Sequence, residues 1–223
     1  MYNVITVGSS TLDTFAQVDC DMVKIKTPAG TENLIAYPSG AKLIITKLDF
    51  HTGGGGTNTA VSLARLGLKV AYLGKVGNDS NAKIILNQLK LDNVKFIGKS
   101  AKGLSGYSVV LDSTEGDRTI LAYKGVNNDL TFKEIDKKKL NAKWFYFSSM
   151  MEKSYETLEE LADFALQKGI KVAFNPSNYL AEKGSVYLKN ILSKTELLIL
   201  NFEEACLIAG TEKIENLIKK LME

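Results

Sequence analysis

Short apolar strands alternate with amphipathic helices along most of this 223-residue sequence, and glycines separate many of these elements. The pattern predicts strands at 4–7, 70–73, 94–97, 144–147, 170–174 and 197–200, and helices at 59–66, 81–91, 155–167, 186–192, 203–209 and 214–221. Alternation at this spacing is typical of βαβ units, whose parallel strands form a sheet with helices on both faces. We therefore expect an α/β protein with a mostly parallel central sheet.

Two segments interrupt this alternation, at about 13–50 and 104–126, and both contain strands and turns without a helical period. The second segment predicts a β-hairpin, with strands at 107–111 and 119–123 around a turn at 113–116. Both segments are too polar and too short to form the central sheet. The sequence thus predicts one domain over 1–223, with a small discontinuous β sheet attached as a lid.

The composition is that of an ordinary globular protein, with 45% hydrophobic and 24% charged residues, which argues against disorder. A net charge of +3, from scattered lysines, does not favour nucleic acid as a partner. No apolar run approaches the roughly 20 residues that span a bilayer, so no membrane partner is expected. Cys20 and Cys206 are too few for a disulfide framework or a four-cysteine metal site, and the N-terminus does not resemble a signal peptide. These features favour the cytoplasm.

Four consecutive glycines, at 53–56, precede Thr57 and Asn58 where a helix is predicted to begin. Glycine permits positive φ and lets a ligand touch the backbone, and free amides at a helix N-terminus favour an oxygen-rich or anionic ligand. Asn58 offers a donor and acceptors for a sugar hydroxyl. The alternative is a flexible loop with a helix cap, which is less favourable because four glycines lose much entropy on ordering.

The glycine run matches neither common nucleotide-binding motif. Asn58 stands where a dinucleotide fingerprint requires its third glycine, and no acidic residue follows at the expected distance. No Gly-Lys-Ser/Thr triplet closes the run, so it is not a Walker A loop. A Rossmann-type oxidoreductase is therefore disfavoured.

Asp13 follows the first predicted strand, and its carboxylate can accept hydrogen bonds from two vicinal hydroxyls or cap a turn. His51 is the only histidine, and a lone histidine is more often structural than a general base. Asn201 and Glu204 follow a strand at capping-box spacing, which by itself predicts helix capping. Polar positions after strands of a parallel sheet share one edge, where ligands bind. The positions expected at that edge are Asp13, 53–58, Asn175 and Asn201.

Seven motifs occur in a fixed order along nearly the whole chain. They are Gly8-Ser9-Ser10-Thr11-Leu12-Asp13, Gly53-Gly54-Gly55-Gly56-Thr57-Asn58-Thr59-Ala60, Leu73-Gly74-Lys75-Val76-Gly77-Asn78-Asp79, Gly116-Asp117-Arg118-Thr119, Gly125-Val126-Asn127, Asn175-Pro176 and Asn201-x-x-Glu204. Together they resemble the motifs of the PfkB/ribokinase-like carbohydrate kinase family. The resemblance implies a three-layer α/β/α sandwich with a β lid.

This family transfers the γ-phosphoryl group of ATP, with Mg²⁺, to a hydroxymethyl group of a small-molecule sugar or nucleoside. The resemblance implies that Asp13 and Asn58 bind the sugar hydroxyls and that Arg118 faces the substrate from the lid. It also implies that Gly54 and Gly55 let the sugar approach the backbone. One type of family member has lysine at the position of Gly55, so the resemblance does not name the sugar.

In the same family pattern, Asn201 and Glu204 would help position Mg²⁺ and the ATP phosphates through water. The family's second motif, Asp-Thr-x-Gly-Ala-Gly-Asp, is absent from this sequence. In the family its last Asp is the general base, and its glycines cradle the transferred phosphoryl group. We therefore assign no catalytic residue or direct metal ligand.

The missing motif predicts a C-terminally incomplete kinase that holds the sugar half of the site and is inactive by itself. The alternative is a non-catalytic protein that binds a sugar or nucleoside in the same cleft. Exposed strand edges invite pairing with another copy, so a homodimer through the lid is also expected.

Overall fold

A computed structural model describes residues 1–18, 22–27, 30–112 and 118–222 of the chain. Its centre is a six-stranded sheet in the order β14-β13-β12-β1-β6-β8, in which every pairing is parallel. These strands are β1 (Tyr2–Val7), β6 (Val70–Leu73), β8 (Lys95–Phe96), β12 (Ala142–Ser148), β13 (Lys171–Asn175) and β14 (Leu197–Leu198). The predicted parallel sheet is confirmed.

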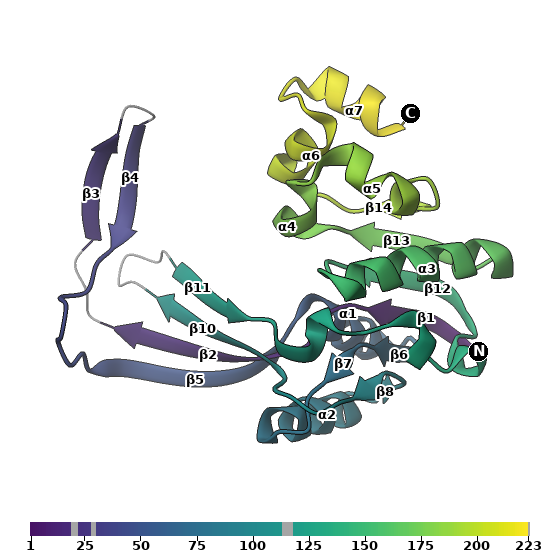
Figure 1. Cartoon of the computed structure of the whole chain (residues 1–223), viewed down its shortest axis with the longest axis horizontal. Coiled ribbons are helices and arrows are strands. Elements are labelled where there is room, and N and C mark those ends of the chain that lie inside the picture. The colour runs from purple at the N-terminus through teal and green to yellow at the C-terminus, as the bar shows by residue number, and fades with distance from the viewer. Residues whose placement is uncertain (19–21, 28–29, 113–117, 223) are drawn as a thin grey trace.

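Helices pack on both faces of this sheet (Figure 1). Along β6, Val70 and Tyr72 belong to one buried apolar cluster whereas Ala71 and Leu73 belong to another, because alternate side chains of a strand point to opposite faces. The first cluster holds α1 (Gly55–Arg65) and α2 (Ser80–Leu91), and the second holds α3 (Lys153–Lys168), α4 (Ser177–Ala181) and α5 (Gly184–Leu192). The α/β fold with three layers is therefore as predicted.

The remaining elements extend or connect this body. Helices α6 (Phe202–Ala209) and α7 (Ile214–Met222) lie beyond β14, at the top of Figure 1. Three 3₁₀ turns, η1 (Gly125–Asn128), η2 (Phe132–Glu134) and η3 (Lys137–Lys139), lead from the lid into β12. Within the described ranges, no helix has both the length and the apolar character needed to cross a membrane.

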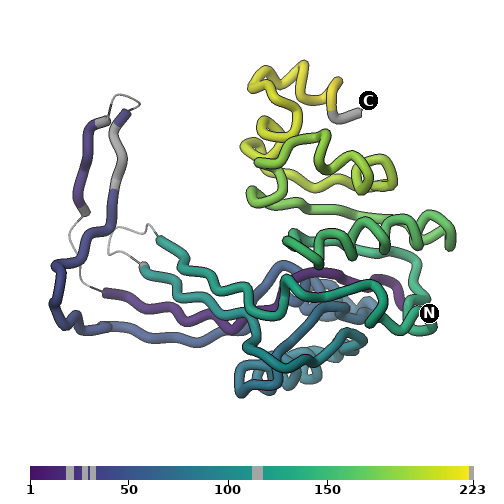
Figure 2. The backbone as a smooth tube through the Cα atoms, in the orientation of Figure 1, coloured from purple at the N-terminus to yellow at the C-terminus, as the bar shows by residue number. Residues whose placement is uncertain are grey.

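A second sheet forms the lid, and its strands extend away from the body (Figure 2). It has the order β11-β10-β2-β5 and comprises β2 (Thr11–Val18), β5 (Ile45–Gly53), β10 (Gly106–Asp112) and β11 (Arg118–Tyr123). The pairing of β10 with β11 confirms the predicted hairpin, while its turn at 113–116 lies outside the described residues. The discontinuous lid is thus present, built from both interrupting segments.

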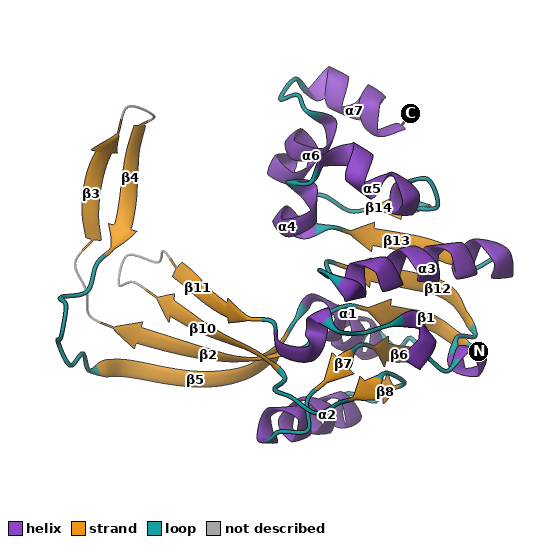
Figure 3. Cartoon of the chain, in the orientation of Figure 1, coloured by secondary structure: helices purple, strands orange, loops and turns teal. Residues whose placement is uncertain are grey.

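Two smaller sheets complete the strands. β3 (Met22–Thr27) and β4 (Gly30–Ile35) form an antiparallel ribbon that stands apart from the body (Figure 3). β7 (Lys75–Val76) pairs with β9 (Lys99–Ser100) beside α2. β3 and β4 lie in the segment 13–50, which was predicted to contain strands and turns, whereas the pair β7–β9 was not predicted, because two-residue strands carry no periodic signal.

The element boundaries differ most around glycine and proline. Helix α1 begins at Gly55, four residues before the predicted start at 59, because contacts with the segment 8–10 and with Ser148 hold four low-propensity residues in helical geometry. The five-residue helix α4 directly follows Pro176 and was missed, since it is too short to show a helical period. β14 ends at Leu198, so the predicted strand 197–200 is two residues too long.

Candidate functional site

The carboxyl ends of the parallel strands bring small and polar residues to one edge of the sheet. β1 leads into the segment 8–10, and β12 and β13 end side by side at Ser148 and Asn175. The Asn175 side-chain amide donates to the backbone oxygen of Ile199 at 2.8 Å, which ties the ends of β13 and β14 together. The lid rises from this edge through β2. Ligands of parallel α/β sheets bind at this edge, so it is the candidate site.

Asp13 lies on β2 between His51 of β5 and Ser108 of β10. The Ser108 hydroxyl donates to Asp13 Oδ1 at 2.5 Å. The second carboxylate oxygen, Oδ2, lies so close to Gly53 that any side chain at that position would collide with it. Asp13 is thus held by one hydroxyl and rests against glycine backbone. Sequence reasoning missed Ser108, because only the strand pairing shows that residues 13 and 108 are neighbours.

The glycine run packs tightly against the segment that joins β1 to β2. Gly54 has φ +102°, and a Cβ there would lie 2.5 Å from the Ser9 oxygen and 2.7 Å from Ser10 Cα. A side chain at Gly55 would collide with the Ser148 hydroxyl. These glycines therefore have a packing requirement within the chain itself, and the approach of a sugar to Gly54 and Gly55 stays a prediction.

The first amides of α1 are also partly occupied. Gly56 and Thr57 donate to the Ser9 oxygen at 3.1 and 3.4 Å, and Thr57 Oγ1 donates to the Gly53 oxygen at 2.5 Å. The expectation of free amides at this helix start is therefore wrong for Gly56 and Thr57. The physical reason is that the β1–β2 connection itself supplies the acceptor.

Asn58 lies in the first turn of α1 and lines a cavity of about 700 Å³ together with Leu12, His51 and Thr52. Asp13 does not line this cavity. Successive residues of a strand point to opposite faces, and Leu12 is buried while Asp13 is half-buried. The structure thus places Asp13 and Asn58 beside the two ends of the same glycine run, and no contact joins their side chains among the described residues.

Arg118 is the first residue of β11 and is exposed. It pairs with Asp112, which in turn pairs with Gln17, four residues along β2 from Asp13. Four residues of a strand span roughly 13 Å. The register therefore does not bring Arg118 to Asp13, and its contact with a substrate stays a prediction.

Asn201 and Glu204 form a capping box at the start of α6. The Glu204 amide donates to Asn201 Oδ1 at 2.8 Å, and the Asn201 amide donates to Glu204 Oε2 at 3.0 Å. Glu204 is buried, with 6% of its surface exposed. The order of the sheet places β14, which precedes Asn201, three strands from β1, or roughly 14 Å. These two residues come together, but apart from Asp13.

Two polar clusters support the root of the lid. Asp79 accepts from the Ala82 amide at 2.9 Å, from the Ser105 amide at 2.8 Å and from the Ser105 hydroxyl at 2.7 Å. Burial raises the pKa of Asp79, but these hydrogen bonds outweigh it, so that the net pKa lies below the usual range. Lys75 is buried and donates to both oxygens of Glu134 at 2.9 Å. Burial opposes ionisation of Glu134, yet the bonds from Lys75 and Thr131 lower its pKa.

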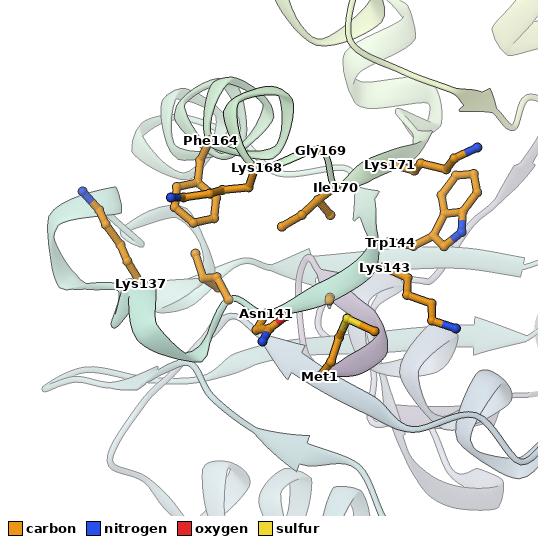
Figure 4. A pocket seen from close by; sticks show the side chains of 12 residues that line it. Met1, Lys137, Asn141, Lys143, Trp144, Phe164, Lys168, Gly169, Ile170 and Lys171 are labelled. Atoms are coloured by element: carbon orange, nitrogen blue, oxygen red, sulfur yellow. The ribbon is translucent and has the colours of Figure 1, made fainter.

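Another cavity, of about 630 Å³, lies at the amino ends of the strands, remote from Asp13. Trp144, Phe164 and four lysines line it, but Figure 4 shows the lysine side chains pointing in different directions. Lys171 is already paired with Glu196 at 3.0 Å. In the described part of the chain, no group of three or more His, Cys, Asp or Glu side chains is placed to hold a metal ion. The edge that carries Asp13 therefore remains the candidate site.

Comparison with known proteins identifies the family of the chain. The family model of the pfkB family carbohydrate kinases matches residues 29–223. A sugar kinase from Archaeoglobus fulgidus, described as uncharacterized, is 30% identical over 151 residues, which cover 65% of this chain and 58% of that protein. A ribokinase from Bacillus subtilis is 28% identical over 186 residues, covering 79% of this chain and 56% of the relative.

Solved structures show the same fold. A ribokinase from Giardia lamblia superposes with a TM-score of 0.81 at 20% identity and covers 100% of this chain and 69% of its own. An adenosine kinase from Sinorhizobium meliloti superposes with a TM-score of 0.79 at 21% identity. The match covers 99% of this chain and 71% of the adenosine kinase chain. The chain thus spans little more than half the length of these two curated relatives and about two thirds of the two solved chains.

Proposed function

Because the chain belongs to the pfkB family of carbohydrate kinases, we propose that it provides the sugar- or nucleoside-binding part of an ATP-dependent kinase. The acceptor is a hydroxymethyl group of the substrate. One observation carries the proposal: the Asp13 carboxylate is fixed by Ser108 against glycine backbone at the root of the lid, where the lid rises from the carboxyl edge of the parallel sheet. A carboxylate held in this way is suited to accept hydrogen bonds from adjacent sugar hydroxyls.

The proposed roles follow from what each residue contacts. Asp13 accepts from sugar hydroxyls, and Ser108 keeps the carboxylate in one orientation. Asn58, exposed in the first turn of α1, donates to and accepts from a hydroxyl at the other end of the glycine run. Gly54 and Gly55 contribute a surface free of side chains. Such orientation lowers the entropy that the transfer step must lose, which is the main contribution a protein makes to phosphoryl transfer.

The nucleotide half is proposed for the start of α6. ATP supplies the phosphoryl group when bound, and Mg²⁺ offsets the charge of its phosphates. Mg²⁺ in proteins keeps several waters and takes one or two carboxylates, which agrees with a water-mediated role for Glu204 and Asn201. Their mutual hydrogen bonds leave Glu204 Oε1 without a bond in the capping box, so the donor set fits an outer-sphere contact.

A homodimer through the lid is part of the proposal. Large apolar side chains are exposed on the lid strands, including Phe50 and Leu48 on β5 and Ile120 and Leu121 on β11. β5 and β11 are the edge strands of the lid sheet, and unpaired edges favour association. A second copy that covers one face of this sheet would bury Leu48, Phe50 and Leu121, which the strand register places on the same face. Size-exclusion chromatography with light scattering tests it, and a monomer at all concentrations contradicts it.

Calorimetric titration of the 223-residue chain with ribose, deoxyribose and adenosine tests the sugar half directly. We expect saturable binding of at least one of them and at least tenfold weaker binding for Asp13→Asn, because the charged acceptor is lost. Asp49→Asn is the matched control, since Asp49 lies on β5 farther along the lid and pairs only with Lys47 at the surface. No binding, or equal weakening in both variants, would overturn the proposal.

A non-catalytic protein that binds a sugar or nucleoside in the same cleft is the second candidate, since it needs only hydroxyl-binding groups such as the Asp13–Ser108 pair. Both candidates predict sugar binding, but they differ in the response of a lengthened form of the chain to MgATP. Release of ADP by that lengthened form that depends on the bound sugar supports the kinase. Tight sugar binding that MgATP does not alter, without ADP release, supports the binding protein.

A further inference from the structure

The side chain of Asn127 bonds both backbone groups of Ser10, although the two residues are 117 positions apart. The Ser10 amide donates to Asn127 Oδ1 at 3.0 Å, and Asn127 Nδ2 donates to the Ser10 oxygen at 2.8 Å. Both residues are buried, with 2% of Asn127 and none of Ser10 exposed. The carboxamide therefore binds the Ser10 amide and carbonyl as the backbone of a neighbouring strand would. Because both residues are buried, water cannot replace either hydrogen bond.

This pair sits where the lid joins the body. Ser10 is the last residue before β2 begins at Thr11, and Asn127 lies in η1, which the chain enters after leaving β11. The third lid strand at this point, β10, begins at Gly106, where a side chain would collide with Asn127 Nδ2 and lie 2.5 Å from the Ser10 oxygen. Asn127 thus bonds the residue that precedes β2, lies against the first residue of β10, and stands four residues after the end of β11.

Asn127 is itself fastened to the body. Its backbone oxygen accepts from the Ser154 hydroxyl at 2.6 Å, and that hydroxyl also accepts from the Leu130 amide at 2.8 Å. Ser154 is fully buried in the first turn of α3. A continuous chain of buried hydrogen bonds therefore runs from α3 through Asn127 to the first residue before the lid.

The register carries this anchoring to the candidate site. Gly106 pairs with Thr11, and two residues farther along Ser108 pairs with Asp13. Whatever fixes Ser10 and Gly106 relative to the sheet also fixes the Asp13–Ser108 pair, which lies only two to three residues away. We propose that Asn127 is a positioning residue that holds the root of the lid, so that Asp13 is presented to substrate over the glycine run.

The chemistry requires asparagine at this position. A single planar group must accept from the Ser10 amide and donate to the Ser10 oxygen, which an amide does. An ionised aspartate accepts but cannot donate, and it would place a charge beside a carbonyl oxygen. Glutamine carries one more methylene, for which the packed site around Gly106 has no room. That Asn127 holds the root of the lid follows from these contacts alone. That it thereby positions Asp13 for a substrate rests on the proposed function.

Hydrogen exchange followed by mass spectrometry tests whether Asn127 holds the root of the lid. In Asn127→Ala and Asn127→Asp we expect amides of 11–18 and 106–111 to exchange at least tenfold faster, while amides of β12 and β13 stay close to wild type. Thr157→Val is the matched control: it removes a buried hydroxyl of α3 that donates to the Leu130 oxygen at 2.7 Å but takes no part in the hydrogen bonds of Asn127, so lid exchange should stay close to wild type. If the Asn127 variants leave lid exchange unchanged, or speed exchange throughout the body to the same extent, the inference is wrong.

Calorimetric binding of the same sugar panel tests the consequence. We expect Asn127→Asp to weaken sugar binding at least tenfold, and Thr157→Val to weaken it less than threefold at an equal loss of thermal stability. Equal weakening at equal stability would show a merely structural role and overturn the inference. If wild type binds no sugar, the proposed function fails together with the substrate consequence, while the exchange experiment still decides the role of Asn127 in the lid.

Discussion

The root of the lid and the start of α6 lie at the same edge of the central sheet, yet their polar groups are used in different ways. At the lid root, hydrogen bonds join residues far apart in the sequence: Asn127 with Ser10, and Ser108 with Asp13. At α6, the side chains of Asn201 and Glu204 accept from each other's backbone amides, three residues apart. The first arrangement fixes one segment relative to another, whereas the second stabilises the helix to which it belongs.

This difference matters for the two halves of the proposed kinase site. Positioning a substrate requires groups whose relative geometry is set by tertiary contacts, and the lid root has such contacts on every side of Asp13. A capping box has the same geometry in any helix. The groups around Asp13 are therefore held in a fixed arrangement by tertiary contacts, as the proposed sugar half requires, whereas the capping box at α6 supplies only a correctly started helix.

The largest expected effect is at the glycine run. Gly54→Ala should lower the free energy of unfolding by about 3 kcal/mol, because alanine is strained at positive φ and its Cβ would meet the Ser9 backbone. Gly67→Ala is the control: its φ is also positive, at +86°, but nothing lies within 4 Å of the added atom, so that about 1 kcal/mol is expected. Urea denaturation measures both. Equal losses would mean that the lid root is not tightly packed.

Next in size is the ion pair below the lid. Glu134→Ala leaves Lys75, which is 7% exposed, without its carboxylate partner. Breaking a fully buried pair costs roughly 3–5 kcal/mol, but the Glu134 side chain is 35% exposed, so we expect about 2 kcal/mol. Glu196→Ala removes the exposed pair with Lys171 and should cost below about 0.5 kcal/mol. Thermal unfolding measures both variants, and an equal fall in the unfolding temperature would show that the buried pair stabilises the protein no more than the exposed pair.

A pH dependence follows from Asp79. Its folded pKa lies below the ordinary value of about 4, so its hydrogen bonds to Ser105 and Ala82 stabilise the protein above that value. The contribution, about 1.5 kcal/mol, is lost as the pH falls from about 4 through the lowered folded pKa. Asp79→Asn should lower the free energy of unfolding at pH 7 and make it fall less steeply as the pH is lowered. Denaturation curves from pH 7 to 2.5 measure this pH dependence. An unchanged pH dependence in the variant would show that Asp79 does not cause it.

Much of the fold was predictable because it depends on local signals. The apolar strand at 70–73 matches β6 residue for residue, and the strand at 144–147 lies within β12. The lid hairpin also appeared in the sequence as two β-rich runs around a turn. Such features rest on side-chain periodicity, which is written into consecutive residues.

The contacts at the site were predictable only in part. Asp13 was identified from its position after a strand, and its pairing with Ser108 was not, because it depends on the register of two strands 95 residues apart. The glycine run was interpreted as open to a ligand, whereas Ser9, Ser10 and Ser148 occupy the space beside it. Tertiary packing of this kind has no periodic signal in the sequence. The capping box at α6 was predicted correctly, since its partners are local.

The smallest effect is expected at α6, and it tests the contrast between the two regions most directly. Asn201→Ala removes an N-cap and should cost about 1 kcal/mol, while Asn201→Asp keeps an acceptor for the Glu204 amide and should cost little. Neither variant should change the affinity for sugar, because α6 begins three strands away from β1. Thermal unfolding and calorimetric titration measure the two quantities in the same samples. A loss of sugar affinity in Asn201→Ala that Asn201→Asp restores would show that the capping box reaches the sugar half, and the two regions would then have to be treated as one site.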